Sequence, residues 1–416
     1  MINIKTICKT LDTKSIQNAI DKVSEKKEVL YFPKGEYKVA SLNLRDNTSL
    51  YLEEGAMISA APEKEWKGVG RMPVLYCENV RNITISGKGT LSATGHEFVD
   101  EKGYKKEIND RPDNIIRFRN AKNILVEDVL FTNTVGWTIH FDNCEDVVVD
   151  GITIKNPPYS QRKNSDGIDI NGCRNVTIKN CFVETGDDAI CLKNIDKGNP
   201  TAKRPDMYNI KVQDCVLAST CNSTKIGTET VGDIYDVHFE NIKIKKHSAI
   251  KKCGAGYPPY DSYHSLSAIS VQSNDGAIVR DITFKNYLVE TIDTPVFILF
   301  QHRDRFVPPS ENAKISNILI ENITVKHAYR NSQILSSDAG KIEGVEIKGL
   351  KVSTFEEKKP EYKYALPTGK EYPDVYNFGT FPAFGLFSRN AKDVKIGKDV
   401  VFYDKKDSGR KDVDIK

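Results

Sequence analysis

The chain has 416 residues, 39% of them hydrophobic, with 60 Lys and Arg against 57 Asp and Glu and a net charge of +3. Because the charges nearly balance and are interleaved, they argue against a basic nucleic-acid-binding stripe, and we expect no nucleic-acid partner. No run approaches the roughly 18 apolar residues that a membrane span needs, so we expect no membrane partner.

The N-terminus begins at Met1 and has no basic region followed by an apolar region and a cleavage site. This predicts a cytoplasmic protein as the sequence is written, or an extracellular or periplasmic one if a signal peptide was removed. The nine Cys include no CxxC pair and no zinc spacing, which favours reduced, buried thiols. We expect no metal, no cofactor and a monomeric protein.

Helical periodicity is confined to the first segment. From Asp12 to Val23, apolar residues recur at helical spacing, which predicts a short helix that caps the open end of a β fold. We assign residues 1–40 to this N-terminal cap and a first coil.

A short repeat of Asn or Asp followed by alternating apolar residues fills most of the remaining chain, at intervals of about 23 to 45 residues. It starts at Asn82, Asn123, Asp146, Asn175, Asn209, Asp236, Asp281, Asn317 and, with glycine, at Gly344. Five residues after each start stand Gly87, Asp128, Gly151, Asn180, Asp214, Asn241, Asn286, Asn322 and Gly349. Gly, Asn and Asp tolerate the left-handed backbone of a tight bend, so each coil is predicted as strand, corner, strand and variable loop.

This pattern predicts an all-β fold, a right-handed parallel β-helix, because hairpin turns between the strands are missing. We expect one domain over residues 1–416. A Pro-, Tyr- and Lys-rich stretch predicts a long loop over about residues 354–382, followed by a last coil and tail over 383–416.

Two acidic segments precede apolar strands on successive coils. Aligning Ile168 with Ile190 places Asp166 directly under Asp188, about one 4.8 Å coil spacing away. Gly186 predicts an irregular turn through which Asp187 reaches the same cleft. Three carboxylates so close together repel one another, and such a group can hold both a proton donor and a base for glycoside hydrolysis. A solvated acidic turn or a cation site is the alternative.

These two segments, Asn-x-Asp-Gly and Gly-Asp-Asp-Ala-Ile-x-Leu-Lys, resemble those of family 28 glycoside hydrolases, the polygalacturonases and rhamnogalacturonan hydrolases with the pectin-lyase-like β-helix. The opening, around Gln17 and Phe32–Tyr37, and the segment Gly136–Phe141 are similar as well. The resemblance implies an inverting mechanism, with Asp187 as general acid and Asp166 with Asp188 activating the water.

The sequence departs from the family on the next two coils. Where members carry Gly-His-Gly, this chain has Asn222 in place of the histidine, and where they carry Arg-Ile-Lys it has Ser270 and Gln272. Those basic residues would pair with a galacturonate carboxylate, so their loss argues against an ordinary endo-polygalacturonase. Lys225 is expected to point into the cleft as a substitute, with a solvated lysine as the alternative.

Further candidates for substrate binding are Lys193, Asn164, His264, Arg303, Trp137 and His140. Lys193 has the same strand parity as Lys225, and either histidine could replace the missing one. Arg303 could grip a uronate, and Trp137 could stack on a sugar. Loop charges and ordinary packing are the alternatives for these residues.

The predicted function is hydrolysis of an α-glycosidic bond in a pectic oligo- or polysaccharide, the expected partner, by exo action. Two alternatives stay open. A β-helix polysaccharide lyase would use a calcium site and a strong base, for which Lys225 is a candidate. A non-catalytic, carbohydrate-binding β-helix would bind without turnover.

Overall fold

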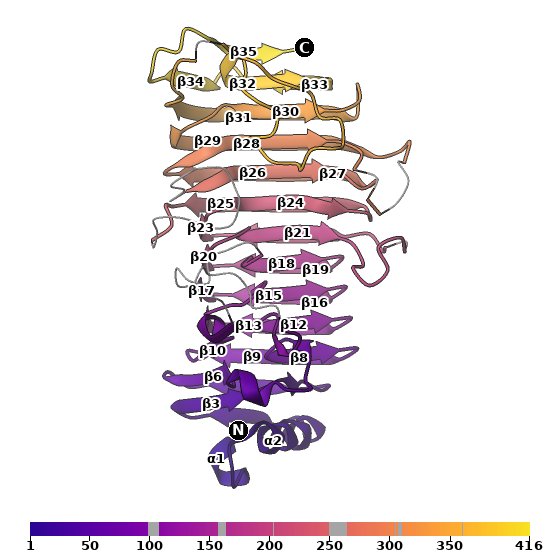
Figure 1. Ribbon diagram of the computed structural model, residues 1–416, viewed down its shortest axis with the longest axis vertical. Coiled ribbons are helices and arrows are strands. Elements are labelled where there is room, and N and C mark those ends of the chain that lie inside the picture. The colour runs from indigo at the N-terminus through magenta and orange to yellow at the C-terminus, as the bar shows by residue number, and fades with distance from the viewer. Residues whose placement is uncertain are drawn as a thin grey trace. The chain divides into compact units, whose positions relative to one another are not determined.

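The computed structural model describes residues 1–98, 108–156, 164–202, 204–248, 264–303, 305–306, 310–359 and 361–416. They divide into an N-terminal unit (residues 1–188) and a C-terminal unit (residues 189–248 and 264–416). Both units are stacks of parallel strands (Figure 1). In the described ranges, no helix has the length and apolar character to cross a membrane. The single domain over residues 1–416 stays a prediction.

The expected capping helix is confirmed. Helix α2 (Thr13–Glu25) follows the short α1 (Ile4–Ile7), and the Asp12 side chain caps it by accepting from the Ser15 N–H at 2.8 Å. Its apolar stripe is buried against β2 (Val29–Phe32) and β4 (Leu42–Asn43) of the first coils. Two single turns of 3₁₀-helix follow, η1 (Glu63–Glu65) and η2 (Gly95–Phe98).

The N-terminal unit contains three parallel ladders. The first consists of β4 (Leu42–Asn43), β8 (Leu75–Glu78), β12 (Ile116–Arg119), β15 (Ile139–Asp142) and β18 (Ile168–Asn171). The second consists of β1 (Ile2–Asn3), β2 (Val29–Phe32), β5 (Ser49–Leu52), β9 (Arg81–Gly87), β13 (Lys122–Glu127), β16 (Glu145–Asp150) and β19 (Arg174–Lys179). The third consists of β3 (Gly35–Val39), β6 (Ala56–Ala60), β10 (Thr90–Ser92), β14 (Leu130–Thr132), β17 (Thr153–Lys155) and β20 (Phe182–Thr185). A separate pair joins β7 (Arg71–Met72) to β11 (Arg111–Pro112).

The C-terminal unit repeats this plan with longer strands. Its first ladder consists of β21 (Ile190–Asn194), β24 (Asn222–Thr230), β26 (Ser265–Ser273), β28 (Ile292–Phe300), β30 (Ser332–Ser336), β32 (Ala383–Arg389) and β35 (Lys411–Ile415). The second consists of β22 (Tyr208–Gln213), β25 (Ile234–Ile244), β27 (Ile278–Val289), β29 (Lys314–Ala328), β31 (Ile342–Thr354) and β33 (Ala391–Ile396). The ends of β25 to β31 bend round a corner into the third ladder, which also holds β23 (Val216–Ser219) and β34 (Val401–Asp404).

The predicted corners have the expected backbone. All nine corner positions, from Gly87 to Gly349, have φ between 55° and 102°. The first residue of each repeat, from Asn82 to Gly344, is also left-handed, with φ between 53° and 68°. The sequence analysis had treated those residues only as markers of the repeat. Gly, Asn and Asp are therefore selected at two bends in each coil.

Each coil buries alternate residues, and residues at equivalent positions of successive coils stack on one another. One aliphatic stack of the N-terminal unit contains Ile83, Ile124, Val147 and Val176. The rings of Phe118 and Phe141 stack at 4.8 Å in the same unit, and those of Phe239 and Phe284 stack at 5.1 Å in the C-terminal unit. This stacking confirms the all-β parallel β-helix, because such a core needs neighbouring coils in exact register.

Side-chain amides form a second kind of stack on the outside of the corners. In the C-terminal unit, Asn286 donates to Asn241 at 3.0 Å and accepts from Asn322 at 2.7 Å. Asn286→Ala should lower the free energy of unfolding by about 2–3 kcal/mol, since it loses these two hydrogen bonds and a longer one to Glu240 at 3.4 Å, and places alanine at φ 58°. Glycine tolerates the bend, so Asn286→Gly should lower the free energy of unfolding by about 1 kcal/mol less than Asn286→Ala does. Equal losses for both variants in urea unfolding would contradict a conformational role.

Candidate active site

The start of β18 lies between two neighbouring segments of the N-terminal unit. The Asp166 carbonyl accepts from the Thr138 N–H at 2.8 Å, and the Gly167 N–H donates to the Asp188 carbonyl at 2.9 Å. The hydroxyl of Thr185 donates to the carbonyl of Ser165. These main-chain bonds place Asp166 and Asp188 on adjacent coils, as the alignment of the two acidic segments indicated.

Two backbone amides hold the Asp187 carboxylate. The Asn164 N–H donates to one oxygen at 2.6 Å, and the Asp188 N–H donates to the other at 2.9 Å. Asn164 adopts φ 67°, the left-handed conformation that asparagine tolerates. One oxygen each of Asp187 and Asp188 lie within 4.8 Å of each other. Asn164 therefore positions Asp187 through its backbone, and its part in substrate binding stays a prediction.

The three carboxylates are nearly enclosed. Asp166 and Asp188 are each 3% exposed and Asp187 is 7% exposed, although all three lie at strand ends. In such surroundings like charges raise each other's energy strongly, and the group favours a state in which at least one carboxyl holds a proton. The arrangement can therefore supply both an acid and a base.

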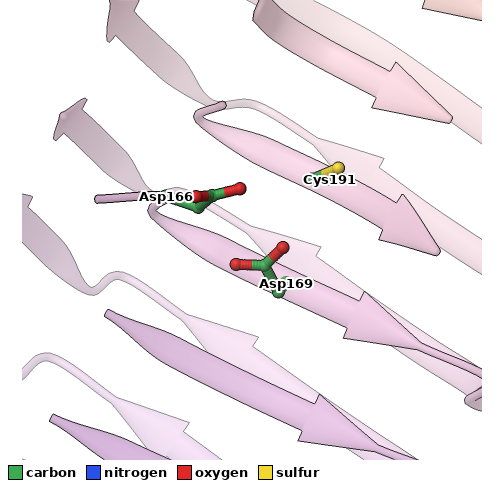
Figure 2. A group of neighbouring side chains, drawn as sticks. All are labelled: Asp166, Asp169 and Cys191. Atoms are coloured by element: carbon green, nitrogen blue, oxygen red, sulfur yellow. The ribbon is translucent and has the colours of Figure 1, made fainter. Parts of the chain in front are cut away.

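A fourth carboxylate, Asp169, belongs to the same group and was not among the predicted site residues. Figure 2 shows Asp166 on the segment before β18 and Asp169 on the strand itself. One oxygen of each lies within 4.8 Å of the other, and Asp169 is fully buried. The signal was available in the sequence, because Ile168 and Ile170 point inward and Asp169 must point to the opposite face.

His140 and Trp137 lie beside this group. His140 on β15 stands opposite Asp169 on β18 in the ladder register and is 8% exposed. The Trp137 ring packs edge-on against the imidazole at 4.8 Å, and the Trp137 carbonyl accepts from the Asn114 side chain. Both predicted candidates thus lie on the carboxylate face, and the packing against His140 fixes the orientation of the indole.

In the C-terminal unit, Lys193 and Lys225 both lower the pKa of the Glu229 carboxyl. Lys225 on β24 stands opposite Cys191 on β21, and the Lys193 ammonium donates to the Cys191 sulfur at 3.0 Å. Burial by itself would raise the pKa of the Glu229 carboxyl, but Lys193, Lys197 and Lys225 hold that pKa below its ordinary value. The two lysines share one face, as their strand parity predicted.

The remaining candidates of this unit have structural partners. Asn222 accepts from the Ser267 hydroxyl at 2.6 Å, and the imidazole of His264 lies 2.7 Å from the carboxylate of Asp293. The His264 ring also stacks on Tyr329 at 4.7 Å. These contacts give both side chains structural partners, and their part in substrate binding stays a prediction.

Arg303 and Gln272 contact the long loop predicted over residues 354–382. Gln272 and Ser270 stand where the family pattern has two basic residues. Arg303 lies over the ring of Tyr372 at 5.7 Å. Gln272 donates to the Ser270 hydroxyl at 3.0 Å and to the Pro373 carbonyl at 3.2 Å, and both Ser270 and Gln272 are almost fully buried. The segment around Pro373 therefore covers the place where the family pattern has its two basic side chains.

Comparison with known proteins identifies relatives of this chain. The family model for glycosyl hydrolases family 28 matches residues 24–202. A polygalacturonase of Persea americana is 22% identical over 325 residues, which cover 76% of this chain and 64% of that protein. An exopolygalacturonase of Zea mays is 24% identical over 318 residues, which cover 69% and 74%. The chain spans 64%, 55% and 43% of the length of three plant relatives, less than two thirds in each case.

The fold is shared with a solved enzyme structure. The crystal structure of a hyperthermoactive exopolygalacturonase from Thermotoga maritima superposes with a TM-score of 0.66 and 18% identity, covering 95% of this chain and 91% of that one. This likeness supports the β-helix assignment.

Proposed function

We propose that the chain is a family 28 glycoside hydrolase, and that it hydrolyses an α-glycosidic bond of a pectic oligosaccharide from the chain end, with inversion of configuration. The observation that carries the proposal is the group of nearly buried carboxylates, Asp166, Asp187 and Asp188, on two adjacent coils. A protonated Asp187 donates to the leaving glycosidic oxygen. Asp166 and Asp188 take a proton from the water that attacks the anomeric carbon from the opposite face.

Two effects act against each other at Asp187. The N–H groups of Asn164 and Asp188 favour negative charge on its carboxylate, whereas the neighbouring Asp188 carboxylate disfavours it. The role of acid requires the repulsion to prevail once substrate excludes water from the group, because the loss of water strengthens every charge interaction. If Asp187 acted as the base instead, it could not donate the proton that the leaving oxygen needs.

Two observations support a substrate other than unbranched polygalacturonate. Ser270 and Gln272 replace the basic pair of the family pattern, and the Pro373 segment covers Gln272. The name of the Zea mays relative favours action at a chain end. We therefore propose a mixed pectic oligosaccharide, of rhamnogalacturonan type, as the substrate.

The two other function classes make different demands. A lyase needs a strong base beside the uronate α-carbon and produces an unsaturated sugar that absorbs ultraviolet light. The Lys225 face offers such a base, but a lyase has no use for a water-activating carboxylate pair. A binding protein needs no protonated carboxyl and releases no product.

We expect the protein to release sugar from rhamnogalacturonan oligosaccharides and to act weakly or not at all on polygalacturonate. NMR in the first minutes should show the inverted anomer. This measurement is decisive, because the nearest oxygens of Asp187 and Asp188 lie within 4.8 Å, closer than the roughly 6.5–9.5 Å typical between the two carboxyl groups of inverting enzymes. A retained anomer would identify one Asp as a nucleophile. Unsaturated product would establish the lyase instead.

A further inference from the structure

A segment of the long loop lies on the outer face of the first ladder in the C-terminal unit, and we call residues 371–379 the strap. Three glutamine side chains of successive coils donate to its main-chain carbonyls. The pairs are Gln272 with Pro373 at 3.2 Å, Gln301 with Glu371 at 3.3 Å and Gln333 with Val375 at 3.2 Å. Phe378 of the strap is buried and packs on Phe297 of β28. The strap is therefore a fixed part of this face.

The strap brings a carboxylate to the side of the first ladder on which Lys225 lies, which we call the Lys225 face. Asp374 follows Pro373, which Gln272 holds beside Ser270, and Ser270 is the β26 partner of Lys225 in the ladder register. Asp374 is 8% exposed, and its carboxylate accepts from the Tyr376 N–H at 3.0 Å. Burial raises the pKa of Asp374, while the Tyr376 N–H and the cations Lys225 and Arg330 oppose that rise. The negative charge of Asp374 thus offsets the positive charge of Lys225, which would otherwise attract the carboxylate of a uronate.

A second carboxylate, Asp293, stands on the same face. One of its oxygens pairs with His264 at 2.7 Å, and its backbone carbonyl accepts from the Arg330 N–H at 2.8 Å. The other carboxylate oxygen is buried and has no hydrogen-bond partner among the described residues. Asp293 also adds to the rise in the pKa of Asp374, so the two carboxyls are electrostatically close.

Further acceptors beneath the strap lack donors. The side-chain oxygens of Gln301 and Gln333 are buried and, within the described ranges, accept no hydrogen bond, although their NH₂ groups bind the strap. Buried acceptors without donors cost free energy.

We propose that Asp374 and Asp293, together with Lys225, form a subsite for an uncharged sugar ring of the substrate, and that Asp374 is the residue that discriminates against a uronate there. The inference rests on the proposed pectic substrate and specifies the charge of one of its sugars. A sugar hydroxyl donates to Asp374, Lys225 donates to a ring or hydroxyl oxygen, and Asp293 acts through its charge. At this place the charges of Asp374 and Asp293 offset those of Lys225 and Arg330, and a uronate meets the repulsion of both carboxylates, which is strongly unfavourable in an interface.

The test uses three trisaccharides with the same linkages: α-1,4-trigalacturonate, its methyl ester and its carboxyl-reduced form. Their binding is measured by calorimetry to Asp187→Asn, which removes turnover, and to the double variant Asp187→Asn/Asp374→Asn. We expect both neutral trimers to bind about tenfold or more tightly than the charged one. Asp374→Asn should reduce that ratio by about tenfold, chiefly through tighter binding of trigalacturonate. The amide keeps the acceptor for the Tyr376 N–H, so the strap should stay in place.

Two matched variants isolate the effect of charge at this position. Asp374→Glu should preserve the discrimination, and Glu346→Gln, which removes an exposed carboxylate of β31, should leave it unchanged. Preference for the charged trimer, an Asp374→Asn ratio equal to the parent's, or binding of none of the trimers overturns the inference. Sugar release by the unmodified protein judges the proposed function separately, so each can fail without the other.

Discussion

Asp187→Asn is expected to lower kcat by about 10²–10⁴, because loss of a general acid removes the proton that the leaving oxygen needs. The melting temperature should change by only a few degrees. Asparagine has the same shape and can still accept from one of the two N–H groups that hold Asp187, although its NH₂ group must face the other. Binding of the intact oligosaccharide should stay within a few-fold of the wild type. Initial rates on rhamnogalacturonan oligosaccharides and calorimetric binding measure these effects.

The matched control is Asp150→Asn in the same unit. Asp150 closes β16 and forms a surface ion pair with Lys179 at 3.2 Å, so its loss should leave kcat unchanged. A large loss of activity in both variants would point to damaged folding. Near-wild-type activity of Asp187→Asn would remove Asp187 from the mechanism, and Asp166 or Asp188 would then have to supply the proton.

The second large effect concerns stability and pH. Asp275 lies between β26 and β27, is 3% exposed and accepts from the Thr230 N–H at 3.2 Å. Burial raises the pKa of Asp275 from 3.8 to about 7, and Glu229 adds to the rise, while the Thr230 N–H and Arg305 oppose it. The folded chain therefore keeps a proton that the unfolded chain loses between pH about 4 and 7. Stability from this group is full below pH 3.8, falls as the pH rises to about 7, and is constant above it.

A shift of this size corresponds to about 4 kcal/mol. Asp275→Asn cannot ionise. The free energy of unfolding of this variant minus that of the wild type should therefore be about 4 kcal/mol higher at pH 8 than at pH 4. Urea unfolding at several pH values measures the difference, and the subtraction cancels the other carboxyls. A constant difference between the two proteins over this range would show that Asp275 titrates normally.

Glu229 adds to the rise in the pKa of Asp275, although burial is the largest cause. Three lysines keep Glu229 ionised, so its charge is present when Asp275 would ionise. Like charges in a buried place disfavour the second ionisation. Removing the first charge with Glu229→Gln should therefore move the pH dependence of Asp275 toward lower pH.

The sequence by itself determined the fold and the core of the candidate site. The corners were predictable because only Gly, Asn and Asp adopt positive φ readily, and residues such as Asn180 and Gly349 recur at a fixed distance from the repeat. The pairing of Asp166 with Asp188 was predictable because a parallel ladder converts equal positions in two repeats into spatial neighbours.

Only the tertiary structure decided the contacts that do not follow the repeat. Asn164 holds Asp187 through its backbone, a geometry set by the irregular turn after β20 and invisible in residue types. Asp374 reaches the Lys225 face on the strap, where Gln272 binds a carbonyl 101 residues further along the chain. A loop without periodicity carries no register, so its position depends on which buried side chains can hydrogen-bond its backbone.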